Sequence, residues 1–83
     1  MTNLAQEAPK LPRAIAFAPS SQIASITYSD DEMTLTIAFQ RGGVYVYKRV
    51  PSDVADGFPN APSAGKYLNE FIKLGGYEYE RIG

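Results

Sequence analysis

Three cations lie close together near the middle of the sequence, at Arg41, Lys48 and Arg49. Lysine and arginine side chains contact nucleic-acid phosphates, and these contacts dominate the affinity of nonspecific binding. The cluster therefore favours a local nucleic-acid site, which Arg81 joins if the end of the chain runs alongside. The competing interpretation is a solvated strand whose cations pair with neighbouring acids.

A second candidate site lies at Pro62–Lys66. If a helix begins there, its free backbone N–H groups and its dipole attract anions. Gly65 would let a ligand or another backbone approach closely, and Lys66 would add positive charge. The glycine spacing is not that of a P-loop. The competing interpretation is ordinary helix capping by Ser63 with tight packing at Gly65.

The sequence lacks the residues on which most catalytic and metal sites depend. It has no histidine and no cysteine, so the commonest general base, metal ligand and thiol nucleophile are missing. The acidic run Asp30–Glu32 does not have the ligand spacing of a calcium loop and predicts a solvated turn. We therefore expect a protein that is not an enzyme and needs no cofactor and no metal.

The composition is that of one small globular domain. The 83 residues are 45% hydrophobic and carry a net charge of −1, which excludes a generally basic nucleic-acid coat. The absence of cysteine favours a reducing compartment. No apolar run is long enough to span a membrane, and residues 1–10 do not resemble a signal peptide. These features predict a cytoplasmic protein without membrane contact.

The first part of the chain differs from the rest. Its prolines disfavour both a helix and a central strand. We therefore predict a partly disordered, proline-containing leader at residues 1–19 and the folded domain at residues 20–83. Ile15 and Phe17 alternate with alanines, so a segment docked in extended form is the alternative to a mobile tail.

Three segments have the composition and alternation of β-strands. Ile23–Ser29 and Val44–Val50 are rich in β-branched and aromatic residues. In Met33–Gln40, apolar residues alternate with polar or small ones, which is the pattern of a strand with one buried face. Polar and glycine-containing turns separate the segments. We therefore expect a three-stranded antiparallel meander.

Two helices and a last strand are expected after the meander. Pro51 suits the first turn of a short helix that ends near Gly57, and Phe58 follows in a loop. Ser63 is a suitable N-cap for a longer amphipathic helix. The apolar stripe of that helix consists of Ala64, Tyr67, Leu68, Phe71 and Ile72. Alternation resumes at Tyr77–Arg81 as a short C-terminal strand. The predicted fold class is α+β, with the longer helix packed on the sheet.

The loop between the second and third predicted strands decides which way Tyr45 and Tyr47 face. A three-residue loop, Arg41–Gly43, places both tyrosines on the buried face and puts Tyr45 opposite Phe39. A two-residue loop, Gly42–Gly43, turns both outward, where an aromatic pair beside cations can stack unpaired bases. The glycines permit either register. We favour the three-residue loop, in which the tyrosines are structural.

Taken together, Ser21–Arg81 resembles a KTSC domain, a family named for the C-terminus of some lysyl-tRNA synthetases. The resemblance rests on Ser21, Ile23, Ile26, Tyr28, Leu35, Ile37, Phe39, Gly42, Gly43, Tyr45-Val46-Tyr47, Val50-Pro51, Ala61, Ser63, Gly65, Tyr67, Asn69 and Ile72. The residues expected to form its structural motif are Tyr45, Tyr47, Pro51, Ser63 and Gly65. The family also occurs as free-standing bacterial and phage copies, which this chain resembles. RNA binding is the function that the synthetase context implies.

These observations predict a small non-catalytic binding module. One hypothesis is that it binds RNA or another nucleic acid. The basic patch would then consist of Arg41, Lys48, Arg49, Lys66 and Arg81. The alternative is a protein-interaction module, such as a phage or bacterial regulator that docks on a larger host or cellular machine. Such a module would bind by strand addition or through an exposed aromatic patch.

Overall fold

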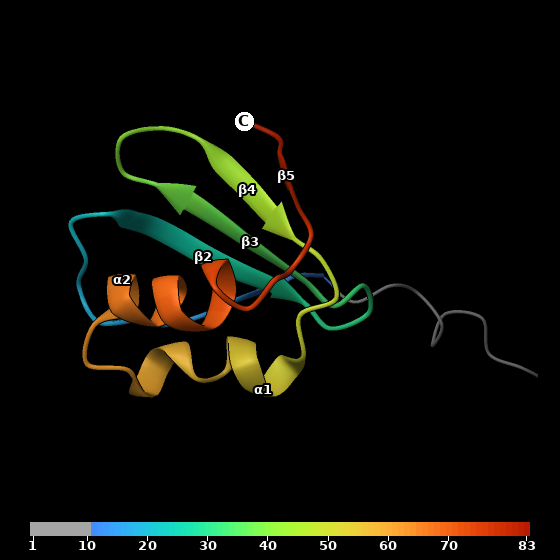
Figure 1. The fold of residues 1–83 in the computed structure, drawn as a ribbon, viewed down its shortest axis with the longest axis horizontal. Coiled ribbons are helices and arrows are strands. Elements are labelled where there is room, and N and C mark those ends of the chain that lie inside the picture. The colour runs from blue at the N-terminus through green and yellow to red at the C-terminus, as the bar shows by residue number, and fades with distance from the viewer. Residues whose placement is uncertain (1–10) are drawn as a thin grey trace, which may run out of the picture.

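The strands form one antiparallel sheet, and the helices lie against one of its faces (Figure 1). The computed structural model describes residues 11–83. In sheet order, the strands are β1 (Arg13–Ala14), β2 (Ile23–Ser29), β3 (Thr34–Phe39), β4 (Val44–Tyr47) and β5 (Tyr79–Arg81). Between β4 and β5 lie α1 (Ser52–Ala55), the 3₁₀ turn η2 (Phe58–Asn60), α2 (Ala64–Tyr67) and the π-helical segment η3 (Leu68–Lys73). The α+β class is confirmed, but four strands precede the helices where three were expected.

The additional strand, β1, lies within the segment predicted to be a leader. It pairs antiparallel with β2, and the N–H of Ile15 donates to the carbonyl of Ile26 at 2.9 Å. The Ile15 side chain is buried in the core, and Phe17 packs against that core. This segment therefore docks in extended form, which was the alternative to a mobile tail. The rest of the predicted leader, residues 1–10, lies outside the described residues.

Two residues with left-handed backbone shorten the predicted strands. Met33 and Arg49 both have a φ of 57°, a region that ends regular strand geometry. As a result β3 begins one residue after Met33, and β4 ends at Tyr47 although we expected it to reach Val50. The N–H of Val50 donates to the carbonyl of Met33 at 2.8 Å. Val50 is thereby fully buried, whereas Met33, expected on the buried face, is exposed.

The β3–β4 hairpin has a three-residue loop, displaced by one residue from the expected one. Tyr45 pairs with Ile37, so the expected pairing of Tyr45 with Phe39 is wrong. The loop is Gln40–Gly42, and it is closed by the N–H of Phe39 donating to the carbonyl of Gly43 at 3.0 Å. The two glycines have φ values of 104° and 99°, which glycine adopts without strain. Tyr45 and Tyr47 still lie opposite the inward-facing Ile37 and Leu35. Both tyrosines of β4 therefore face the helices, as predicted.

The longer helix departs from one regular α-helix. Ser63 caps α2 as predicted, and its hydroxyl oxygen accepts from the N–H of Lys66 at 3.3 Å. In η3 the hydrogen bonds span five residues, as between the N–H of Leu74 and the carbonyl of Asn69 at 3.0 Å. The wider turn of η3 changes which side chains point at the sheet. Phe71, predicted in the buried stripe, is therefore 51% exposed.

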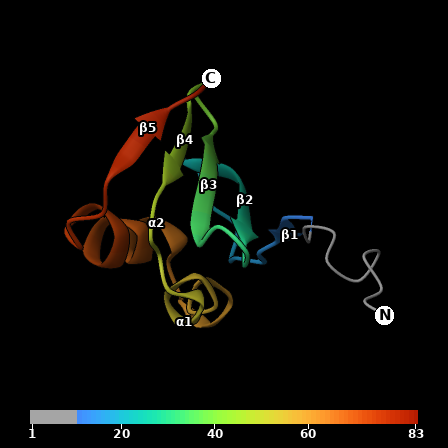
Figure 2. The ribbon, with the colours of Figure 1, turned by 90° about the vertical axis from the view of Figure 1, so that its right-hand side faces the viewer.

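One buried apolar cluster lies between the sheet and the helices. Its members are Ile15, Ile23, Ile26, Tyr28, Leu35, Ile37, Tyr47, Val50, Ala55, Phe58, Ala64, Leu68 and Ile72. Phe58, expected in a loop, is fully buried. The other face of the sheet carries no helix of residues 11–83 (Figure 2), and Thr27, Thr36 and Val46 form a row across it. Packing on one face only leaves the margins of the sheet–helix interface open to solvent.

Candidate functional site

Aromatic side chains of β3, β4 and β5 line a cleft at one margin of the sheet–helix interface. The cleft has a volume of about 510 Å³, within the range of roughly 300–1,000 Å³ that small-molecule sites occupy. We call it the tyrosine cleft. The residues that line it are Phe39, Gly42, Tyr45, Tyr47, Ile72, Lys73, Tyr77 and Tyr79. The sheet therefore supplies one wall, and the end of η3 with the following segment supplies the other.

Ring contacts order the sheet side of the tyrosine cleft. Tyr79 lies opposite Tyr47 in the β4–β5 ladder, with ring centroids 5.6 Å apart. The same ring lies 6.0 Å from that of Tyr45, which meets Phe39 edge-on at 5.7 Å. Tyr47 is 4% exposed, whereas Tyr79 is 61% exposed. The cleft thus has a buried floor at Tyr47 and an accessible wall at Tyr79.

Four tyrosine hydroxyls of the cleft have no hydrogen-bond partner among residues 11–83; they belong to Tyr45, Tyr47, Tyr77 and Tyr79. Among these four, Tyr47 is the strongest candidate for a ligand contact, because its side chain is almost wholly buried. No buried side-chain oxygen in this part of the chain lacks a partner, so the Tyr47 hydroxyl must reach the cleft. Burial raises the pKa of Tyr47, and the neighbouring Tyr79 and Tyr45 raise it further. The hydroxyl is therefore neutral at physiological pH and can donate or accept a hydrogen bond.

Two cations stand at the rim of the tyrosine cleft, one from η3 and one from β5. The Nζ atom of Lys73 lies 5.7 Å from the ring centroid of Phe39. The guanidinium carbon of Arg81 lies 5.8 Å from the ring centroid of Tyr45. Arg81 Nε also donates to the carbonyl of Gly83 at 2.8 Å. The cleft therefore combines aromatic faces with positive charge at its entrance.

Lys73 also lines two further hollows that adjoin the tyrosine cleft. One, of about 500 Å³, shares Phe39 with the cleft and passes Arg41 at the hairpin tip. The other, of about 520 Å³, shares Gln22 with the first and reaches Lys66 at the start of α2. Because these three hollows share walls, we treat them as one groove. Among the described residues that line it there are three cations and no acid.

The structure does not bring together all five cations of the predicted basic patch. Lys48 lies 3.5 Å from the carboxylate of Glu80, and Arg49 lies 2.8 Å from that of Glu78. Lys48 and Arg49 therefore fit the competing interpretation of the basic cluster, in which the cations of a solvated strand pair with neighbouring acids. The other three line the groove or stand at its rim: Arg41, Lys66 and Arg81.

The start of α2 is a packed helix cap. Ser63 already accepts from the N–H of Lys66, which removes one of the amides that an anion would use. A Cβ atom at Gly65 would lie 2.9 Å from Oε1 of Gln22, so the glycine permits close packing against the segment before β2. The contribution of this region to the groove is the side-chain charge of Lys66.

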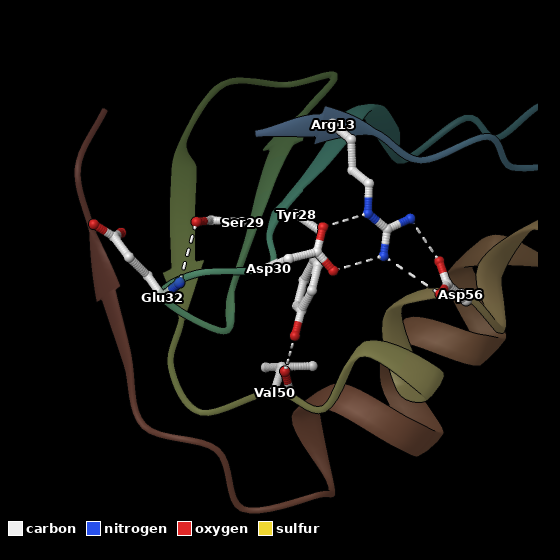
Figure 3. A network of polar contacts seen from close by, with 7 residues as sticks. All are labelled: Arg13, Tyr28, Ser29, Asp30, Glu32, Val50 and Asp56. Carbon is white, nitrogen blue, oxygen red and sulfur yellow. Dashed lines mark hydrogen bonds and ion pairs between the residues drawn. The ribbon is translucent and has the colours of Figure 1, made fainter. Parts of the chain in front are cut away.

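The opposite edge of the sheet is held by three charged residues, which we call the clamp: Arg13, Asp30 and Asp56 (Figure 3). The Arg13 guanidinium donates to both oxygens of Asp30 at 2.7 and 3.2 Å and to both oxygens of Asp56 at 2.8 and 3.3 Å. These bonds, to Asp30 first, hold the pKa of Arg13 above its ordinary value. Arg13 therefore joins β1 both to the turn after β2 and to the end of α1, and Asp30 lies in an exposed turn, as predicted, while also pairing with Arg13.

Several cleft residues escaped prediction as ligand contacts, namely Phe39, Lys73, Tyr77 and Tyr79. Tyr77 and Tyr79 alternate with acids in the sequence, which indicates a strand and does not indicate a site. Their relevance depends on β5 pairing with β4, which sets Tyr79 beside Tyr47. The sequence gives little indication that Lys73 contacts a ligand, because a lysine in the last turn of a helix is explained by the helix dipole alone.

Within residues 11–83, no group of three or more acidic side chains is placed to hold a metal ion. No helix in this part of the chain is both long enough and apolar enough to cross a membrane.

Comparison with known proteins assigns most of the chain to one family. Residues 19–79 match the family model described as the KTSC domain. This chain belongs to the KTSC domain family. Its curated KTSC-containing relatives include the lysine–tRNA ligases of Nostoc punctiforme and Trichormus variabilis, each 42% identical over 62 residues. The matched part is 75% of this chain and 11% of each ligase, so the chain spans a small part of their length.

Relatives of similar length also carry the KTSC region. An uncharacterised protein of Stutzerimonas stutzeri is 33% identical over 63 residues, which are 76% of this chain and 89% of that protein. A crystal structure of a KTSC domain protein from Yersinia pestis matches with a TM-score of 0.77 and 33% identity, over 88% of this chain and 100% of that one. The family predicted from the residues is therefore confirmed.

Proposed function

We propose that this KTSC protein is a non-catalytic module that binds single-stranded nucleic acid, and RNA in particular, along the groove. The observation that carries the proposal is the acid-free lining, in which Lys66, Arg41 and Lys73 lead into the tyrosine cleft. Binding of a single strand needs a positive track for the backbone together with aromatic faces for the bases. The absence of histidine and cysteine from the sequence supports a binding role over a catalytic one.

Local charge supports phosphate contacts although the net charge of the chain is −1. The acids of the ion pairs do not line the groove: Asp30, Asp56, Glu78 and Glu80. Each phosphate contact to a single strand contributes about −0.7 to the slope of log affinity against log salt concentration. Three groove cations therefore predict a slope of roughly −2.

Lys48 and Arg49 leave the basic patch that the sequence suggested. Each already faces a glutamate, Glu80 and Glu78 respectively, so a phosphate would have to replace a partner that is in place. We propose Lys73 as a phosphate contact in their place, because it lines all three hollows of the groove. The revised set of cations is Arg41, Lys66, Lys73 and Arg81.

The names of two relatives support RNA as the ligand class in this proposal. Two of them are named as ligases of lysine and tRNA, and the KTSC region forms 11% of each. A segment of this family thus occurs in proteins whose named substrate is an RNA. In this chain, the groove and the tyrosine cleft are the surface whose chemistry suits such a ligand.

Fluorescence anisotropy with a labelled single-stranded oligoribonucleotide at low salt tests this function. Lys73→Glu should weaken binding by about tenfold or more, because it reverses the charge at the junction of the groove. Lys48→Glu is the matched control, since it makes the same change outside the groove and should alter affinity by less than about twofold. Far-ultraviolet circular dichroism verifies that both variants fold. No binding by the unmodified protein, or equal losses in both variants, would refute the proposal.

A protein partner is the alternative, and exposed apolar side chains at the end of the helical region favour it. Phe71 and Leu74 are 51% and 75% exposed, and rings and branched chains of this kind anchor protein interfaces. A pull-down from lysate treated with nuclease separates the two functions. A partner protein that persists after nuclease, and is lost when Phe71 and Leu74 are both changed to serine, would favour the protein interaction.

A further inference from the structure

The floor of the tyrosine cleft is more specialised than phosphate binding requires. Tyr28 and Tyr67 donate their hydroxyls to the backbone carbonyls of Val50 and Val54. Tyr47 is comparably buried to Tyr28, yet its hydroxyl reaches the cleft without a partner among residues 11–83. The hydroxyl oxygen is accessible to solvent, since no buried side-chain oxygen of these residues lacks a partner, and a hydroxyl open to the bottom of a cleft can hydrogen-bond a ligand.

A flat accessible ring stands next to that hydroxyl. Tyr79 is 61% exposed, and its ring contacts Tyr47 and Tyr45 on the sheet side. An unpaired nucleobase offers a π-face for stacking and a polar edge for hydrogen bonds. Lys73 and Arg81 at the rim lie where the charged phosphates on either side of such a base would pass.

We infer that the tyrosine cleft holds one unpaired nucleobase of the strand that occupies the groove. Tyr79 is the stacking platform, and the hydroxyl of Tyr47 contacts the base edge. The inference rests on the proposed function and adds the base-binding site within it. A duplex presents paired, stacked bases that cannot enter the cleft, so the cleft selects single strands.

A single-stranded oligoribonucleotide with one 2-aminopurine base provides the test, because this base loses fluorescence when it stacks on an aromatic ring. The unmodified protein should quench the probe on binding. Tyr79→Leu should abolish the quenching and weaken binding about tenfold. A duplex of the same sequence should bind at least about tenfold more weakly than the single strand. The exposure of Tyr79 makes it a site where substitution leaves folding intact.

Two variants that each remove one tyrosine hydroxyl form the matched comparison. Tyr47→Phe should weaken binding of the oligoribonucleotide by about two- to tenfold, the range for one lost hydrogen bond, and should leave the thermal midpoint unchanged. Tyr67→Phe removes a hydroxyl that donates to Val54, so it should lower the thermal midpoint and leave affinity unchanged.

The outcomes separate this inference from the proposed function. If the oligoribonucleotide binds but the probe is not quenched, and the two phenylalanine variants bind equally well, the base site is wrong and the groove function stands. If the unmodified protein binds no oligoribonucleotide at low salt, the proposed function fails and the base site fails with it.

Discussion

The clamp edge of the sheet and the tyrosine cleft use the same residue types in different ways. At the clamp, Arg13 lies 5.4 Å from the ring of Tyr28 and engages two carboxylates, while the Tyr28 hydroxyl donates to a backbone carbonyl. At the cleft, Arg81 lies 5.8 Å from the ring of Tyr45. There, no carboxylate of residues 11–83 forms an ion pair with Arg81, and the tyrosine hydroxyls lack partners.

This difference shows why residue type alone does not identify a site. An arginine beside a tyrosine is structural when surrounding groups use most of its hydrogen-bonding capacity, as Figure 3 shows for Arg13, which makes four hydrogen bonds with its five N–H donors. The same pair is a candidate ligand site when that capacity is left over next to an accessible cleft. Variants matched across the two regions test whether the distinction holds.

The largest expected effect on stability comes from the apolar core, at Phe58, which follows the clamp residue Asp56 by two positions. Phe58→Ala should lower the free energy of unfolding by about 3–5 kcal/mol, because the ring is fully buried and a cavity remains. Phe71→Ala, the same change at a ring that is 51% exposed and stacked on Tyr67, should cost less than about 1.5 kcal/mol. Urea denaturation measures both. Similar costs would show that the two rings are equally buried in solution.

Alkaline pH should produce the next largest effect, through tyrosines that the fold keeps protonated. Burial raises the pKa of Tyr28, Tyr47 and Tyr67, whereas tyrosines of the unfolded chain ionise near about pH 10. Their contribution is therefore fully present below about pH 10 and is lost as the pH rises toward the folded pKa. The free energy of unfolding should fall by up to ~1.4 kcal/mol per pH unit for each tyrosine.

Tyr47→Phe isolates the cleft contribution to this alkaline loss. The variant cannot ionise at that position, so its stability relative to the unmodified protein should increase by up to about 1.4 kcal/mol between pH 9 and pH 11. Urea midpoints at a series of pH values supply the measurement. A difference that does not vary with pH would mean that Tyr47 ionises as readily in the fold as in the unfolded chain.

The smallest expected effect comes from the clamp itself, whose side chains are partly exposed and therefore screened by solvent. Arg13→Lys keeps the positive charge but cannot bond two carboxylates at once, so the thermal midpoint should fall by a few degrees. Arg41→Lys makes the same change at an exposed hairpin tip without an ion pair to residues 11–83, and it should leave the midpoint unchanged. Equal thermal midpoints for the two variants would contradict the stabilising role of the clamp.

Much of the fold could be predicted from local patterns. The favoured three-residue loop predicts correctly that Tyr45 and Tyr47 face the helices. The observed loop begins one residue earlier, but a shift of one residue on both strands leaves each side chain on its predicted face. The expected register itself is off by one residue on each strand, since two adjacent glycines permit more than one loop closure. Ser63 as the cap of the longer helix is also predicted correctly.

Features that depend on distant contacts could not be predicted in this way. The strand β1 is two residues long, and its Arg13 bonds Asp56, which is 43 positions away. No pattern within β1 distinguishes it from a tail. The burial of Phe58 and the exposure of Phe71 likewise follow from how the helical region packs, including the π-helical segment η3.

The sequence by itself determined the family and the α+β class, because these follow from residue order and from alternation with a period of two. It favoured the buried face for Tyr45 and Tyr47 but permitted either loop, and the register of β3 and β4 decided between them. The tertiary structure alone decided which cations are already paired and which line the groove. It also decided that Tyr47, Tyr79 and Lys73 surround one cleft. The physical reason is that a side chain becomes available to a ligand through the partners it lacks, and those partners come from parts of the chain that are remote in sequence.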